Sequence, residues 1–503
     1  VKHYGLAFNL TGGPLYPSLY YNPANFRYWH PQWTRQSLGS VFGLTLDSRG
    51  AIYVGHSEVY ANYSLSQVGT VVNPIIRPNT TGTINRLDQI TGLPTKFMNL
   101  PQLGTGSGIG NICYNADHNC FYVTNLHDAR IYRLNGTTGA IMSNYNPFSG
   151  VVAMGGVPDP LAVNVSAPLG KRIWAVERLR DRVYFSVWSQ DGSTTSNPLN
   201  TVRSVKIGPA GDFIPGTGQL ELTAPPNTSY GSTQFGHPIS DIAFSPDCRM
   251  LIAERSMFSP TGTGAHDARV IEFQRVGGVW TPTTTNTNVP ITQGPPIGNF
   301  GSQTNSAGGC DYDYRVQQPI ANRRGIWATA DAELLGSPFN SAVYGFMGMD
   351  RVGATPTTST NCDYDGVLTS SNKTLQGDVS ITAPAACIRV TNENIACRMD
   401  GSVVTGFTYT ATITNLATFP ISTAQFSIIG SPGVVTPATL ALGTIPPGGT
   451  FPVNLVITGV SSGSTVCLGI QTGIQNEIAC RSTRCLTMPN CACGQVQRLT
   501  TSC

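Results

Sequence analysis

Short stretches in which apolar and polar residues alternate cover much of the chain, and turns rich in Gly, Pro, Asn and Asp separate them. Alternation with a period of two is typical of strands that bury one face. Gly (55) and Pro (35) are plentiful, which suits a turn-rich protein. The pattern predicts an all-β chain. No apolar run approaches the roughly 18 residues that cross a bilayer, so we expect no transmembrane segment.

A repeated unit is visible around the tetrapeptide HDAR. "HDARIYRL" begins at His127 and "HDARVIEF" at His266. Each copy follows a strand–turn–strand pattern, "IGNICYNADHNCFYVTNL" in the first case and "ISDIAFSPDCRMLIAERS" in the second. HDAR then opens a third alternating stretch, and a Gly-containing turn leads to a fourth. The unit is therefore a four-stranded antiparallel sheet.

Looser copies of this unit extend along the chain. We expect first strands to begin near Phe42, Ile109, Leu161, Ile239 and Gly308, and "RDRVYF" takes the place of HDAR in the third copy. Four strands per unit, at a period near or above that of known propeller repeats, predict a β-propeller. We expect five to seven blades, with six favoured. The sixth would combine the N-terminal "YGLAFNL" with "GVLTSSNKTLQGDVSI" and so close the ring.

HDAR has a structural and a catalytic interpretation. Asp128, Asp181 and Asp267 would each lie at the turn before a third strand, where a carboxylate accepts main-chain N–H bonds. A His–Asp pair acting as a base would need a nucleophile, and copies in different blades would lie far apart. The structural interpretation is the better one.

The pattern changes near Pro384. The stretch "GFTYTATITNLATFPISTAQFSIIGSPGVVTPATLALGTIPPGGTFPVNLVITG" has four short alternating strands separated by Pro/Gly turns, which is typical of an immunoglobulin-type sandwich. The organisation we expect is an N-terminal segment (1–37), a propeller (38–383), and a sandwich with a Cys-rich tail (384–503). The N-terminal segment would either help close the ring or add a strand to a neighbouring molecule.

Two resemblances accompany these patterns. The motif "LDSRGAIYVG…INRLDQITG" resembles secreted β-propellers of the NHL or lactonase-like kind, and "ITNLATFPIS…LGTIPPGGT" resembles Ig-like modules of bacterial surface proteins. Such propellers host binding scaffolds, hydrolases and lyases, so the fold alone implies no single function.

Composition narrows the functional classes. Charged residues make up 11% of the chain and the net charge is +3, with no basic cluster, so nucleic acid is not an expected partner. Thirteen cysteines predict export to an oxidising compartment, with a secreted or surface-associated location. The C-terminal tail offers "CAC" and no His, which favours disulfides over zinc. Its expected disulfide cysteines are Cys387, Cys397, Cys467, Cys480, Cys485, Cys491, Cys493 and Cys503.

Spacing predicts a further disulfide, and sequons permit glycosylation without implying it. Cys113 and Cys120 flank a hairpin turn, and we expect them to form a disulfide across it. An odd cysteine total leaves at least one thiol free or paired between molecules. The N-x-S/T sequons permit N-glycosylation at Asn9, Asn62, Asn79, Asn135, Asn164, Asn227 and Asn372.

Calcium is the cofactor that the sequence allows. Asn111, Asp241 and Asp311 occupy similar places near the starts of first strands, and in lactonase-like propellers such residues surround calcium at the channel mouth. Gly43 and Ala162 depart from that pattern, and the alternative is that these side chains line a wet channel.

A second calcium candidate is "NCDYDG". It places Asn361, Asp363 and Asp365 as in an EF-hand loop. Asn372 stands where the loop's Glu belongs, and an acidic turn is the alternative.

No complete catalytic motif is present: G-x-S-x-G, HExxH and a P-loop are all absent. We therefore expect a secreted, non-enzymatic protein that assembles with copies of itself into a filament, coat or adhesive surface. The alternatives are a calcium-dependent hydrolase or lyase of the lactonase type, and a carbohydrate-binding surface protein for which "FRYWHPQW" would supply aromatic rings. An enzyme should gather at least three acidic or amide oxygens at the channel mouth.

Overall fold

The computed structural model divides the chain into two compact units. The first comprises Val1–Phe244 and Met250–Ile381, and the second is built on Thr382–Cys503. With short internal gaps, the structure describes 30–57, 82–100, 108–155, 167–283, 305–312, 325–331, 344–349, 360–363, 377–381 and 388–491, and strand fragments at 7–8, 20–21 and 27–28.

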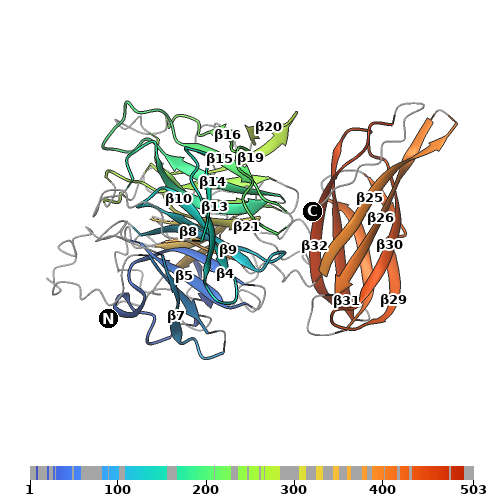
Figure 1. Cartoon of the computed structure of the whole chain (residues 1–503), viewed down its shortest axis with the longest axis horizontal. Helices are drawn as coiled ribbons and strands as arrows, with labels where there is room; N and C mark the ends of the chain where they lie inside the picture. Colours follow the sequence, from blue (N-terminus) through green and yellow to red (C-terminus); the bar gives the residue numbers. More distant parts are fainter. Residues whose placement is uncertain are drawn as a thin grey trace. The chain divides into compact units, whose positions relative to one another are not determined.

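The first unit contains a series of sheets that are antiparallel between successive strands (Figure 1). Sheet 1 consists of β4 (Val41–Leu46), β5 (Ile52–His56), β6 (Thr83–Leu87) and β7 (Pro94–Asn99). Sheet 2 consists of β8 (Ile109–Asn115), β9 (Cys120–Asn125), β10 (Arg130–Asn135), β11 (Ile141–Tyr145) and β12 (Val152–Met154). Sheet 3 consists of β13 (Arg172–Leu179), β14 (Arg182–Trp188), β15 (Thr201–Lys206) and β16 (Gln219–Thr223).

The next two sheets continue the series. Sheet 4 consists of β17 (Ile239–Phe244), β18 (Met250–Glu254), β19 (Val270–Val276) and β20 (Val279–Pro282). Sheet 5 consists of β21 (Ser306–Tyr312), β22 (Ile326–Ala330), β23 (Gly345–Met349), β24 (Thr360–Asp363) and the N-terminal β2 (Tyr20–Tyr21). The short helix α1 (Arg35–Leu38) precedes sheet 1, and β1 (Ala7–Phe8) pairs with β3 (Arg27–Tyr28).

The first strands of the sheets converge. Each contacts the first strand of the next sheet, in the order β4, β8, β13, β17 and β21, and β8 also contacts β17. In Figure 1 the labels of β8, β13 and β21 lie near the middle of the unit, and those of β7, β16 and β20 lie at its periphery. The first unit is therefore a β-propeller-like arrangement of radiating sheets.

Burial explains the two kinds of strand in these sheets. The first strands β17 and β21 are buried along their whole length, because neighbouring sheets cover both of their faces. The outer strand β16 has mostly exposed positions. Strands that bury one face have the strongly alternating sequence pattern. The fully buried first strands alternate less, and they contain small and polar residues as well as apolar ones.

Four of the five predicted first strands are confirmed. They begin at Val41, Ile109, Ile239 and Ser306. The third prediction, near Leu161, is wrong, because the first strand of sheet 3 is Arg172–Leu179. Asp181 ends the tight turn after it, so "RDRVYF" opens the second strand of its sheet rather than the third.

A short extended segment, 377–381, lies between sheet 5 and sheet 1, and we call it the axial segment. On one side Thr329 Oγ1 of β22 donates to the Gly377 carbonyl at 2.8 Å, and the main-chain N–H of Ile381 donates to Asp311 at 2.6 Å. On the other side the Leu44 N–H of β4 donates to Asp378 Oδ2 at 3.1 Å. The axial segment therefore bridges the first and last described sheets.

The second unit is a two-layer sandwich. One sheet has the order β25 (Ile388–Asp400), β26 (Val403–Asn415), β30 (Thr450–Thr458) and β28 (Val434–Thr436). The other has the order β29 (Thr439–Ile445), β27 (Ile421–Ile429), β31 (Thr465–Ile474) and β32 (Glu477–Thr487). Phe407 and Leu455 of the first sheet share one hydrophobic cluster with Phe426 and Leu468 of the second. Among the described helices none is long and apolar enough to span a membrane.

Candidate functional site: the axial cluster

Polar side chains of the converging strands meet in a group that we call the axial cluster: Asn111, Glu177, Asp241, Asp311 and Asp378. The three residues predicted at the channel mouth, Asn111, Asp241 and Asp311, all belong to it and are all buried. Asn111 Nδ2 of β8 donates to Asp241 Oδ1 of β17 at 2.9 Å, although another sheet separates these strands in the series. This contact is possible because the first strands converge.

Asp378, on the axial segment, was not predicted as a site residue. Its side chain hydrogen-bonds that of Asp241. Burial, the Asp241 charge and this bond raise the pKa of Asp378, so it carries the proton that is donated to Asp241. The sequence held a usable signal, because "GDVSI" has an Asp before an alternating stretch, as do "SDIAF" and "CDYDY".

The three aspartates use their oxygens in the same way. In each, Oδ1 accepts the N–H of the following residue: Ile242 at 2.8 Å, Tyr312 at 2.7 Å and Val379 at 2.7 Å. In each, Oδ2 accepts an N–H from the next element around the ring: Cys310 at 2.9 Å, Ile381 at 2.6 Å and Leu44 at 3.1 Å. Every carboxylate oxygen of the set therefore accepts a main-chain bond, and each aspartate links two neighbouring elements.

Hydroxyl groups on second strands form a parallel set of links. Thr124 Oγ1 donates to the Trp174 carbonyl, Ser186 Oγ to the Ile239 carbonyl at 2.7 Å, and Thr329 Oγ1 to the Gly377 carbonyl. Each acceptor lies on the next first strand or on the axial segment. In sheet 4 the second strand has Ala253, and Ser240 of the first strand donates to Gly308 instead. The axial segment thus receives the link that a first strand receives elsewhere.

Glu177 of β13 and Cys113 of β8 form a hydrogen-bonded pair of titratable side chains in this region. The Cys113 thiol donates to Glu177 Oε1 at 3.1 Å. Burial is the main cause that raises the pKa of Glu177 to about 7, and the Asp241 charge adds to it. Burial and then the Glu177 charge raise the pKa of Cys113, which keeps it a thiol at neutral pH rather than a reactive thiolate.

An apolar cluster lies next to these polar residues, towards the starts of the first strands. It contains Phe42, Leu126, Trp174, Trp188 and Met257, contributed by sheets 1 to 4 or by residues directly after them. The rings of Phe42 and Trp174 are 5.0 Å apart, and those of Trp174 and Trp188 are 5.3 Å apart. The aromatic rings therefore pack sheet 1 against sheet 3.

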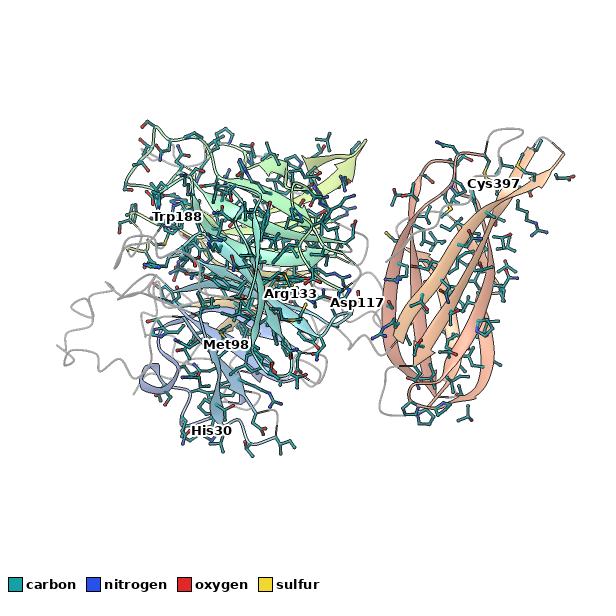
Figure 2. All side chains as sticks on the ribbon, viewed as in Figure 1. His30, Met98, Asp117, Arg133, Trp188 and Cys397 are labelled. Atoms are coloured by element: carbon teal, nitrogen blue, oxygen red, sulfur yellow. A yellow bond between two sulfur atoms is a disulfide. The ribbon has the colours of Figure 1, made fainter. Side chains whose placement is uncertain are left out.

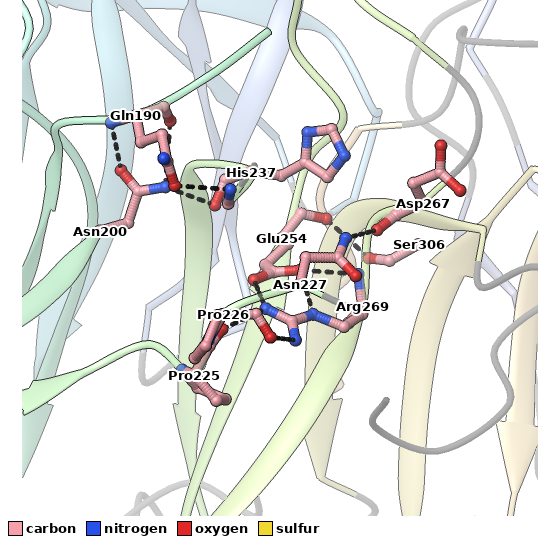
Figure 3. A network of polar contacts seen from close by, with 11 residues as sticks. Gln190, Asn200, Pro225, Pro226, Asn227, His237, Glu254, Asp267, Arg269 and Ser306 are labelled. Carbon is pink, nitrogen blue, oxygen red and sulfur yellow. Dashed lines mark hydrogen bonds and ion pairs between the residues drawn. The ribbon is translucent and has the colours of Figure 1, made fainter. Parts of the chain in front are cut away.

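The first HDAR copy is confirmed as a turn element. Arg130 N–H donates to Asp128 Oδ1 at 3.0 Å, and the Tyr132 hydroxyl donates to Oδ2 of the same residue. In the second copy, Arg269 forms a fully buried ion pair with Glu254 and also donates to the carbonyls of Pro225 and Pro226 (Figure 3). Both aspartates precede third strands, whereas Asp181 precedes a second strand.

The predicted Cys113–Cys120 disulfide is wrong. Both residues are buried free thiols. In the β8–β9 ladder Cys113 lies opposite Tyr122 and Cys120 opposite Asn115, so the two cysteines are not cross-strand partners. The register, which the hairpin spacing alone does not fix, is the reason.

The C-terminal cysteines fit the prediction better. Cys397 of β25 and Cys491 form a disulfide (Figure 2 labels Cys397), and Cys467 is also disulfide-bonded. Cys480 and Cys485 lie on β32, but their side chains fall outside the described part, as do Cys387, Cys493 and Cys503. Their pairing stays a prediction.

The EF-hand-like segment is not a loop. Asn361 and Asp363 lie on β24, where they pair with Met347 and Gly345 of β23. An antiparallel ladder does not provide the tight turn that an EF-hand calcium loop needs. Asp365 falls outside the described residues, among which no group of three His, Cys, Asp or Glu side chains is arranged to hold a metal ion.

The described sequons differ in access. Asn227 is 1% exposed, and its Nδ2, the atom that glycosylation would modify, donates to the Asp267 carbonyl at 2.6 Å. Glycosylation there is incompatible with the fold, so Asn227 is removed from the candidates. Asn135 is half-buried and accepts the N–H groups of Thr137 and Thr138. The other predicted sites, Asn9, Asn62, Asn79, Asn164 and Asn372, lie outside the described residues.

The aromatic stretch "FRYWHPQW" ends in a buried residue. Trp33 is 2% exposed, packs with Leu38, Val54 and Leu87, and donates its Nε1–H to the Gly92 carbonyl at 2.7 Å. Its ring therefore belongs to the core and is not available for stacking on a sugar.

Comparison with known proteins finds only distant likenesses. No family model and no curated protein matches the chain. A hydrazine synthase of Kuenenia stuttgartiensis is 9% identical, with 77% of this chain and 80% of that chain covered and a TM-score of 0.32. A putative 6-phosphogluconolactonase of Bacteroides uniformis is 11% identical, with 89% and 99% covered and a TM-score of 0.32. Likenesses at this level carry no argument about activity.

Proposed function

We propose that this protein is a secreted, non-enzymatic structural subunit that assembles with copies of itself into an extracellular filament or coat. One observation carries the proposal. Each oxygen of Asp241, Asp311 and Asp378 accepts a main-chain N–H, so the polar groups at the centre of the first unit join neighbouring sheets. A catalytic carboxylate, by contrast, must have an oxygen within reach of a substrate proton.

We further propose that the propeller has six blades. The axial segment accepts the link from Thr329 that first strands accept elsewhere, and Asp378 acts as Asp241 and Asp311 do. These equivalences support the axial segment as the first strand of a sixth blade. The pair β1–β3 is our candidate for the rest of that blade, since the chain would then close its ring with both ends.

The location and the second unit form part of the same proposal. The Cys397–Cys491 disulfide supports an oxidising compartment, because such bonds are rare in cytosolic proteins. We assign the sandwich to the immunoglobulin type on its two four-stranded sheets and shared core. Its role would be contact with neighbouring copies or with a cell surface.

Electron microscopy of the native material, with and without reductant, tests the proposal. We expect regular fibres or sheets, and their loss on reduction would place a disulfide between subunits. Single particles in all conditions and at all concentrations would rule out the assembly. Negative stain of the same sample after refolding provides a check on whether assembly is spontaneous.

A calcium-dependent enzyme is the second candidate, and one observation favours it. The Asp241 charge acts on the buried carboxyl groups of both Glu177 and Asp378, although the three side chains are not arranged as a metal site in the described structure. A calcium ion held there should raise the thermal midpoint of the first unit, and a chelator should lower it. Unchanged midpoints in both conditions would remove this candidate.

A further inference from the structure

Sheet 5 differs from the other described sheets at its outer edge. In sheets 1 to 4 the outermost strand is the next segment along the chain, and every pair is antiparallel. In sheet 5 the outermost strand is β2, which comes from the other end of the chain and pairs with β24 in parallel. A sequence-distant strand thus completes this edge.

Strands β2 and β24 pair through their main chains. Tyr20 lies opposite Asn361, and Tyr21 lies opposite Cys362. Strand addition at a sheet edge derives its affinity mainly from main-chain hydrogen bonds. The same hydrogen bonds can form whether the added strand comes from the same molecule or from another copy. Exchange of this strand between copies therefore loses none of these bonds.

We propose that residues 20–21 of one copy add to β24 of a second copy, and that this exchanged strand links subunits of the assembly proposed above, on which this inference rests. The partner is therefore another copy of this chain. The contact is heterologous when each copy gives its strand to a different neighbour, because the strand of one copy then meets the sheet edge of the next. Contacts of this kind build open filaments unless the rotation closes a ring.

Concentration should control the exchange. A strand tethered to its own sheet has an effective concentration of about a millimolar, so a neighbouring copy competes only at a similar local concentration. We therefore expect the strand to pair within its own molecule in dilute solution and between molecules in the crowded assembly. The same protein could therefore be a monomer in dilute solution and a stable filament at high concentration.

Disulfide trapping in the full-length protein tests the inference. Partner Cα atoms on adjacent strands lie about 4.8 Å apart, within the range that a disulfide spans. One tagged copy carries Tyr20→Cys and a second, differently tagged copy carries Asn361→Cys. The two are mixed under assembling conditions and oxidised mildly, and the linked peptides are mapped by mass spectrometry, because the chain has cysteines of its own.

The matched control replaces Asn361→Cys by Met154→Cys, on the outer strand of sheet 2, where the side chain is 74% exposed. We expect a link between differently tagged copies through positions 20 and 361, at least tenfold above the link with Met154→Cys, and rising with concentration. A third variant carries Tyr20→Cys and Asn361→Cys in one chain. It reports pairing within a molecule.

The outcomes separate the inference from the proposed function. Fibres with a 20–361 link only within molecules would overturn strand exchange and leave the structural role intact. A link between copies without fibres would support exchange and overturn the filament. No link of either kind would overturn the inference, because the strand pairing would then not form in solution.

Discussion

At the residue scale, the Asp241–Asp378 pair shows how a buried polar contact depends on protonation. Two carboxylates in contact cannot both ionise cheaply, so one of them keeps its proton. Burial raises the pKa of Asp241 to about 6, from an ordinary value of 3.8, and that of Asp378 is raised further by the Asp241 charge. At a pH between the ordinary value of 3.8 and the raised folded values, the folded state therefore binds more protons than the unfolded state.

The first prediction concerns pH. Because both folded pKa values are raised, this pair contributes most to stability below about pH 4, and its contribution is lost as the pH rises through about 6 and above. Asp378→Asn keeps a neutral donor beside Asp241 and should flatten the dependence of the first unit's thermal midpoint between pH 4 and 7.

Asp311→Asn is the matched control for that measurement. Asp311 accepts two main-chain N–H groups, those of Tyr312 and Ile381, as Asp378 does those of Val379 and Leu44. This variant therefore measures how far the loss of such main-chain bonds lowers the midpoint at a single pH. An unchanged slope in Asp378→Asn would show that the pair does not control the pH response.

The second prediction compares the two HDAR arginines. Arg269→Met would leave the Glu254 carboxylate buried without its partner, since both side chains of this ion pair are fully buried. Breaking such a pair typically costs about 3–5 kcal/mol. Arg130→Met removes a half-buried bond to Asn144 and should cost about 1 kcal/mol. Chemical denaturation measures both, and equal costs would contradict the structure.

At the element scale, the sequence predicted strands well and their relations less well. The alternating pattern located four of five first strands, because turn residues and β-branched stretches are local signals. It misplaced the strand at Arg172, because a hairpin with a short turn resembles any other pair of alternating strands. The Cys113–Cys120 bridge failed for a similar reason, since register depends on partners across the ladder.

In the candidate site, too, the residues could be predicted from local sequence but their contacts could not. Asn111, Asp241 and Asp311 were identifiable from their equivalent places in the repeats. That their oxygens would bind main-chain N–H groups of the next element was not predictable, because it depends on how neighbouring sheets pack. Asp378 was missed because its segment, although predicted to belong to the sixth blade, was not aligned with the first strands of the other repeats.

The third prediction tests the close packing of first strands. A Cβ on Gly43 of β4 would lie 2.8 Å from the Asn111 Cα of β8, closer than such atoms approach. Gly43→Ala should therefore force sheets 1 and 2 apart and destabilise the first unit by about 1–3 kcal/mol. Gly208→Ala is the control, because its nearest atom would be the Asp212 carbonyl oxygen at 3.8 Å. Equal thermal midpoints for the two variants would contradict this packing.

At the scale of the whole molecule, the two units are stabilised by different means. The first unit depends on sheet-to-sheet links, and three of its described cysteines, Cys113, Cys120 and Cys310, are free thiols. The second unit has a continuous apolar core together with the Cys397–Cys491 disulfide, which closes a loop of 94 residues. Two units with separate cores are expected to unfold in separate transitions.

The fourth prediction follows from this difference. Calorimetry should resolve two transitions, and reductant should lower only the one that belongs to the second unit. Loss of one disulfide typically costs about 2–4 kcal/mol, chiefly because the unfolded chain gains freedom. Cys397→Ser together with Cys491→Ser should reproduce part of that shift without reductant. If reductant instead lowered the transition of the first unit, that unit would have to contain a disulfide. Such a result would contradict the structure, in which Cys113, Cys120 and Cys310 are free thiols.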